Sequence, residues 1–125
     1  MAYQRIGETL TLPADGAIAP NRIVVKSTTG AAQSTANQAN PIGVTVEGRD
    51  GKNQVGIQTS WIVQITAGGV VTQGDYVISD STGRAVTAVP GVTGVIAYFV
   101  GVALTTTTAA GQLVDVLLTK FVGLH

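Results

Sequence analysis

The sequence predicts an all-β protein, either a small compact β-barrel or a β-sandwich. Its apolar residues fall in short runs rich in Val, Ile and Thr, and Gly, Asn, Asp, Ser or Pro separate these runs. Such runs are typical of strands and turns, because β-branched side chains pack well on a pleated sheet. No helix-length window free of Gly and Pro repeats apolar residues at three- and four-residue spacing. Only Ala31–Ala39 has the composition for a turn or two of helix.

Five strands are expected in the first half of the chain. Glu8–Leu12 alternates polar and apolar residues towards its end and stops at Pro13, because proline lacks the N–H that a paired strand needs. Arg22–Lys26 carries a β-branched run that precedes a turn. A hairpin is predicted around "EGRDGKN", whose two glycines favour a tight connection. The remaining strands of this half are Ile42–Glu47, Val55–Gln58 and Trp61–Thr66.

Four strands are expected in the second half. A hairpin forms around "SDSTG", and two longer strands follow it. These strands are Asp75–Ser79, Arg84–Thr87, Ile96–Leu104 and Leu113–Phe121. Tight turns need Gly in a left-handed conformation or an Asp side chain that bonds the turn amides. The turn-forming residues are therefore expected to be Gly30, Gly74, Asp75 and Gly83, with Gly74 and Gly83 at positive φ.

Two similar stretches, "TTGAAQS" at 28–34 and "STGRAVT" at 81–87, indicate an internal repeat of hairpin units. The matched residues are Gly30 with Gly83, Val24 with Val77, Gly43 with Gly101, Val44 with Val102, Gln54 with Gln112 and Val55 with Leu113. A pseudo-twofold repeat would let two units bury each other's apolar faces and close as a small barrel. Chance similarity between Gly-rich β segments is the alternative.

Composition favours one domain of neutral surface. The chain has 125 residues, and 45% of them are hydrophobic but only 11% are charged. We expect residues 1–12 to form an extended amino-terminal arm and residues 13–125 to form a single β-domain. Seven Lys and Arg balance seven Asp and Glu without forming runs, which argues against direct binding of nucleic acid or a membrane. The absence of cysteine excludes disulfides, and no signal or membrane-spanning segment is visible.

The residues for catalysis are few, and no enzyme activity is expected. His125 is the only histidine and stands at the end of the chain, so neither a triad nor a zinc site can be assembled around it. Asp75 and Asp80 flank one strand, but each lies where aspartate commonly bonds turn amides. The sequence therefore predicts no catalytic residue, no cofactor and no metal.

Three stretches in order, "GETLTLPA", "ITAGGVVTQGDYVISDSTGRAVT" and "VGVALTTTTAAGQLVDVLL", resemble the capsid cement, or head decoration, proteins of tailed bacteriophages. The resemblance implies a structural protein that is made in the host bacterial cytoplasm and binds the outer surface of an icosahedral head. It also implies the major capsid protein as partner, self-association as a homotrimer, and stabilisation against the pressure of the DNA. The alternative from the residues alone is a β-barrel recognition module for a ligand or single-stranded nucleic acid.

Apolar residues in the amino-terminal arm and between residues 92 and 99 are the candidate interface. The arm could add main-chain hydrogen bonds to a neighbouring chain, and the apolar residues between 92 and 99 are too many for the outer face of a monomer. The predicted capsid or subunit contacts are Tyr3, Ile6, Leu10, Leu12, Val92, Tyr98 and Phe99.

Overall fold

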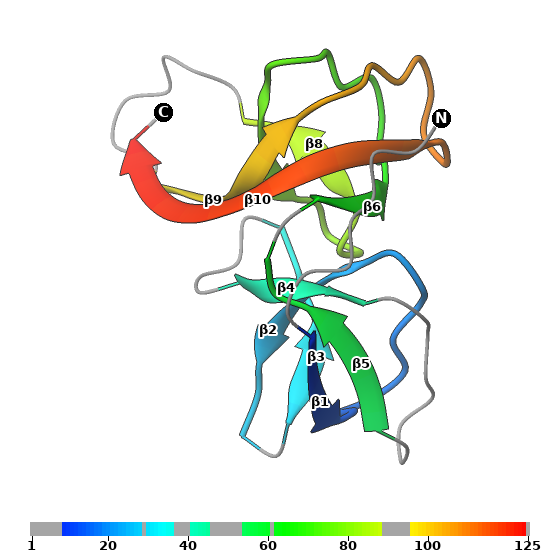
Figure 1. Cartoon of the computed structure of the whole chain (residues 1–125), viewed down its shortest axis with the longest axis vertical. Helices are drawn as coiled ribbons and strands as arrows, with labels where there is room; N and C mark the ends of the chain where they lie inside the picture. The colour runs from blue at the N-terminus through cyan, green and yellow to red at the C-terminus, as the bar shows by residue number, and fades with distance from the viewer. Residues whose placement is uncertain are drawn as a thin grey trace.

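The computed structural model describes residues 9–28, 30–36, 41–45, 54–60, 62–88 and 96–124, and all regular elements in these ranges are strands (Figure 1). The strands form two five-stranded antiparallel sheets, which confirms the all-β prediction. The first sheet contains β1 (Thr9–Pro13), β2 (Ile23–Lys26), β3 (Ala31–Gln33), β4 (Pro41–Thr45) and β5 (Gln54–Gln58). The second contains β6 (Ile62–Thr66), β7 (Tyr76–Ser79), β8 (Ala85–Thr87), β9 (Ile96–Ala103) and β10 (Leu113–Leu124).

Strand β3 corrects one expectation. The short helix considered for Ala31–Ala39 is wrong at its start, because Ala31–Gln33 pairs with β2. Ala31 is fully buried and also bridges Ala14, so packing and pairing override the local helix propensity of alanine. The part of the expected helix at residues 37–39 lies outside the described residues.

The predicted arm does not coincide with a structural boundary. Residues 1–8 lie outside the described residues, whereas Thr9–Pro13 form β1 and pair with β5 of the same chain. Strand addition to a neighbour can therefore involve only the residues that precede β1. The division into an arm and a single domain stays a prediction.

The strand order reveals an internal repeat. The first sheet has the order β1-β5-β4-β2-β3 and the second has the order β6-β10-β9-β7-β8, so the second half repeats the connectivity of the first. The pairing of Val24 with Gly43 recurs as the pairing of Val77 with Gly101. The two matches made from sequence for these strands therefore hold at the level of single residue pairs.

The other three sequence matches, made for Gln54, Val55 and Gly30, are shifted by one residue. Leu12 pairs with Val55 as Ile65 pairs with Val114, so the partner of Val55 in the repeat is Val114 and not Leu113. The turn after β7 is one residue longer than the turn after β2, because Lys26 pairs with Ala31 but Ser79 pairs with Ala85. Gly30 and Gly83 are thus similar in sequence but not equivalent in position.

Neither sheet closes into a barrel within the described residues. The two edge strands of each sheet meet only at one isolated parallel bridge, Ala14 with Ala31 in the first half and Ala67 with Ala85 in the second. The expectation that the halves need one another to form a barrel is also wrong, because the first half has its own core. That core is made of Ala14, Ile18, Val24, Ala31, Val55 and Ile57, with Leu12 and Ile42 packed against it.

The halves are stacked along the long axis of the molecule (Figure 1). Ile23 and Val44 of the first sheet belong to the same buried cluster as the core residues of the second half. The Ile23 amide donates a hydrogen bond to the Gly83 carbonyl, 2.8 Å away, and the Thr66 amide donates to the Asn21 carbonyl, 2.9 Å away. The halves therefore meet through different surfaces, and the expected twofold relation does not hold.

A glycine allows a close strand crossing in each half. A β-carbon at Gly43 would overlap the Gln58 carbonyl oxygen, and one at Gly101 would overlap the Leu117 carbonyl oxygen. The neighbouring backbone leaves no room for any side chain at either position. The recurrence of this contact explains why the Gly-Val pair was the clearest sign of the repeat in the sequence.

We expect Gly101→Ala to lower the free energy of unfolding by about 1–3 kcal/mol, because the new methyl group must displace backbone. Gly56→Ala is the matched control, since Gly56 also lies in a strand but has open space at its β-carbon position. Urea unfolding of both variants measures the difference. Equal stability of the two variants would show that the strand crossing is misplaced.

Candidate functional site

The outer face of the second sheet carries an apolar row that crosses four strands. Ile62 pairs with Leu117, Leu117 with Val102, and Val102 with Tyr76. Residues directly opposite one another in antiparallel strands point to the same face, so the four side chains lie side by side. We call them the outer row. The Tyr76 side chain is 51% exposed and the other three are half-buried.

An aromatic pair extends the outer row. The rings of Tyr76 and Phe99 have their centroids 5.2 Å apart and are tilted by 53°. This geometry is favourable for aromatic rings and fixes the Tyr76 side chain on the sheet. Phe99 is buried by this contact and by its neighbours, with 8% of it exposed. Ile78 and Val86, a half-buried cross-strand pair, lie on the strands beside it.

The predicted interface residues differ in whether the structure describes them and in how exposed they are. Tyr3, Ile6 and Val92 lie outside the described residues. Leu10 is 42% exposed, Leu12 is half-buried against the first core, Tyr98 is half-buried and Phe99 is buried. Of the described positions, Leu10 and Leu12 lie on β1 of the first sheet and Tyr98 and Phe99 on β9 of the second, so the interface itself stays a prediction.

Sequence reasoning missed Tyr76 as a surface residue. In β7 the burial alternates, with Tyr76 exposed, Val77 buried, Ile78 half-buried and Ser79 buried. This alternation was readable from the sequence once β7 was placed. What the sequence did not reveal is which apolar faces the stacking of the halves covers.

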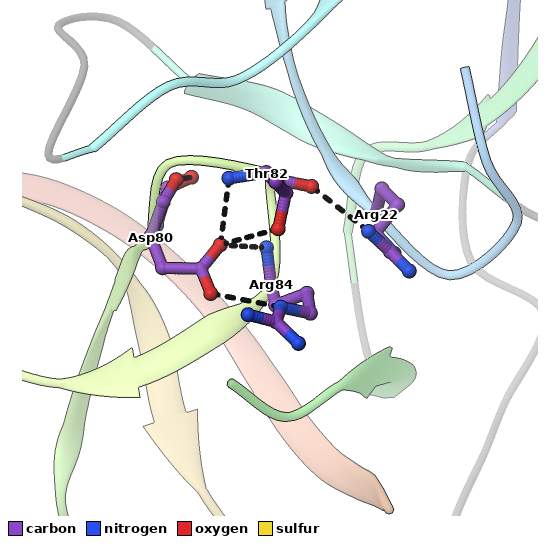
Figure 2. Close-up of polar contacts among 5 residues, drawn as sticks. Arg22, Asp80, Thr82 and Arg84 are labelled. Atoms are coloured by element: carbon purple, nitrogen blue, oxygen red, sulfur yellow. Dashed lines mark hydrogen bonds and ion pairs between the residues drawn. The ribbon is translucent and has the colours of Figure 1, made fainter. Parts of the chain in front are cut away.

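The turn between β7 and β8 is built around Asp80 (Figure 2). The Asp80 Oδ1 atom accepts hydrogen bonds from the amides of Thr82 at 2.9 Å and Arg84 at 2.8 Å, and Oδ2 accepts one from Arg84 Nε at 2.9 Å. Burial alone would raise the pKa of Asp80, but these amides and the Arg84 guanidinium hold the pKa below its ordinary value of 3.8. Both oxygens of the Asp80 carboxylate thus accept hydrogen bonds within the turn.

The same turn joins the two halves. Arg22 Nη1 donates a hydrogen bond to the Thr82 carbonyl oxygen, 3.0 Å away (Figure 2). A β-carbon at Gly83 would lie 3.0 Å from the Ile23 carbonyl oxygen and 2.9 Å from Gln33 Cγ. The turn is therefore seated against the first half with no space for a larger residue at its glycine.

The other expected turn residues also lie in bends. Gly74 has a φ of 94° and Gly83 a φ of 78°. Asp75 Oδ2 accepts hydrogen bonds from the Thr72 amide at 3.0 Å and from Thr87 Oγ1 at 2.8 Å. The Gly30 amide donates to Ser27 Oγ at 3.1 Å.

Asn21 is a left-handed residue that sequence reasoning did not find. Its φ is 56°, and its amide bonds the Thr45 carbonyl as the Gly74 amide bonds the Ala103 carbonyl. Asparagine tolerates this conformation better than other residues with a side chain, so the repeat keeps the bend without a glycine.

Asp75 and Asp80 are occupied by turn hydrogen bonds, and no group of three His, Cys, Asp or Glu side chains suited to a metal occurs in the described ranges. Across those same ranges no helix has the length and hydrophobicity to cross a membrane. The candidate site is therefore the apolar outer row with its aromatic pair.

Comparison with known proteins found a matching family and a similar solved structure, each of which covers most of the chain. A family described as "Phage cement protein" matches residues 4–118. A search of curated proteins found no match. Among solved structures, the head fiber gp8.5 N base in bacteriophage phi29 superposes with a TM-score of 0.70 at 22% sequence identity, over 90% of this chain and 93% of that one. At this identity the likeness is one of fold.

We expect Gly83→Ala to destabilise the protein by about 1–2 kcal/mol, because alanine is strained at positive φ. Thr82→Ala, the adjacent control, removes only an exposed hydroxyl bond to Asp80 and should change stability by less than about 0.5 kcal/mol. Thermal unfolding of both variants tests this difference. Similar losses in the two variants would contradict the assignment of Gly83 to the seated turn.

The Asp80 turn predicts an acid-sensitive contribution to stability. A carboxyl group whose pKa is lowered on folding stabilises the protein above its unfolded pKa, and this contribution disappears as the pH falls through the folded pKa. We expect Asp80→Asn to be less stable than the unmodified protein by about 1 kcal/mol or less at pH 7. The difference in stability should shrink as the pH falls below 3.8, the ordinary pKa of the carboxyl group. Urea unfolding from pH 7 down to strongly acidic buffer measures it, and a gap that stays constant with pH would refute the role of the charge.

Proposed function

The chain belongs to the phage cement protein family, and from this premise we propose that it binds the outer surface of an icosahedral phage head and stabilises it against the pressure of the packaged DNA. As a member of that family it is a structural phage protein. The match over residues 4–118 is the observation that carries the proposal. The chemistry of the described surface agrees with it, because that surface presents apolar contacts and turn-bound carboxylates.

The neutral composition supports a protein that is covered by neighbours on the head. Charged residues make up 11% of the chain, and charged residues are depleted in the cores of protein interfaces. Exposed apolar residues occur in both halves, with Leu10 in the first and Val70, Tyr76 and Leu113 in the second. A subunit with several separate contact points can bridge neighbouring capsid subunits.

Bridging makes weak contacts effective. Once one contact has formed, the second forms at a high effective concentration, so avidity exceeds the affinity of either contact. We propose the major capsid protein as the partner, a homotrimer as the bound form, and strand addition by residues 1–8 as one anchor. The protein would be made in the host bacterial cytoplasm and join the virion on the outer capsid surface.

Heads that lack the protein should assemble but lose DNA at a lower temperature, or at a lower chelator concentration, than decorated heads. Adding the purified protein should restore their resistance. A variant without residues 2–8 keeps all of β1 and should bind heads more weakly while unfolding like the full chain. Release of DNA is followed with a dye, and binding by co-sedimentation with heads.

Undecorated heads as resistant as decorated ones would refute the stabilising role. Equal head binding by the truncated and the full chain would refute the anchor alone.

A further inference from the structure

The same cross-strand row occurs in both halves but is covered in only one of them. In the first half it runs through Gln58, Val44 and Ile23, which pair across β5, β4 and β2. These residues are 2%, 0% and 0% exposed. The equivalent residues of the second half belong to the outer row, where Tyr76 takes the place of Ile23 and is 51% exposed. The fold thus repeats a packing surface and buries one copy of it.

The cover of the first row is the end of the other half. We call the end of each half that carries the row its head, and the end that carries the first hairpin turn its tail. Ile23 at the first head bonds Gly83 at the second tail, and Asn21 beside it bonds Thr66. The contact is therefore head to tail, and it leaves the second head and the first tail at opposite ends of the stack (Figure 1).

We propose that the outer row is a self-association surface whose occupant is the first-half tail of a second copy of this chain. The tail in question contains Pro13, Lys26, Ser27 and Gly30. It is the surface equivalent to the one that already covers Ile23 inside the chain, so the contact between copies continues an interface that the fold uses internally.

Each open end carries a charged residue that its internal counterpart lacks. Arg22 at the first head and Asp75 at the second are equivalent, because each carbonyl accepts a bond from the equivalent amide of Thr45 or Ala103. Lys26 is the last residue of β2, is exposed, and stands where Ser79 stands in the second tail. Asp75 at the open head and Lys26 at the open tail have opposite charges, and the exposed Asp15, whose amide bonds the Ala31 carbonyl, also lies at the tail.

Two features of the tail make the contact between copies weaker than the internal one. Its turn is one residue shorter, so Gly83, whose carbonyl accepts the bond from the Ile23 amide, has no counterpart there. Thr66, whose amide bonds Asn21, is replaced in the first tail by Pro13, which has no amide hydrogen. Association between copies then depends on burial of the outer row and on charge. A head-to-tail contact closes into a ring when its rotation allows, and otherwise grows into a filament. A ring of three copies would be the homotrimer named in the proposed function. The inference rests on that proposed function only in assuming that the chain self-associates.

The test uses the purified full chain in the absence of phage capsids. Light scattering after size exclusion, over a range of protein concentration, should show assembly of the unmodified chain. Tyr76→Glu at the head and Lys26→Glu at the tail should each raise the Kd of assembly about tenfold or more. Val70→Glu is the control, because Val70 is an exposed apolar residue outside the outer row. Unfolding curves establish that each variant is folded.

Mixing the two variants gives the sharpest result. Tyr76→Glu keeps an intact tail and Lys26→Glu an intact head, so the mixture should form a one-to-one dimer although each variant alone stays monomeric. An unmodified chain that is monomeric at all concentrations, or an assembly that neither variant weakens, would overturn the proposal. If Tyr76→Glu still assembles but no longer binds the phage capsid, the outer row contacts the capsid and not a second copy, and the proposal is overturned. If a monomeric chain binds the phage capsid, the proposed function holds but the interface between copies does not exist.

Discussion

Strand β2 is buried on both of its faces, and the arrangement of the molecule depends on this. Val24 points into the core of the first half, whereas Ile23 belongs to the core of the second. A five-stranded sheet of this size buries little surface by itself, and small isolated units are marginally stable. By sharing Ile23 and Val44 with its neighbour, the first half gains burial that its own curled sheet does not provide.

The same sharing explains how much of the fold the sequence could reveal. Nine of the strands were predictable from β-branched runs and turn residues, and the matches of Gly43 with Gly101 and Val44 with Val102 were correct, because these signals act within a strand or a turn. The shifts at Val114 and after Ser79 were not predictable, because an added turn residue changes register without changing composition. Strand β3 was missed since its alanines favour a helix until Ala14 and β2 are in place.

The candidate site was harder to predict than the fold. Apolar residues in a strand reveal a buried face, but they do not reveal whether the cover comes from the same chain. Ile23 and Tyr76 illustrate this, because they hold equivalent places and differ only in what lies above them. Phe99 is 8% exposed and its ring lies against Tyr76, and its place at an interface stays a prediction. Family membership supplies what composition leaves open, namely that the partners are those of a phage particle.

The repeat also places equivalent residues under two different physical constraints. Ile23 is held in place by the core, so a change there is felt by the whole molecule. Tyr76 occupies the matching position outside the core, where a substitution alters the surface and leaves the interior packing in place. The repeat thus gives one copy of the row to internal packing and leaves the other at the surface, where its contacts can change at no cost to the core.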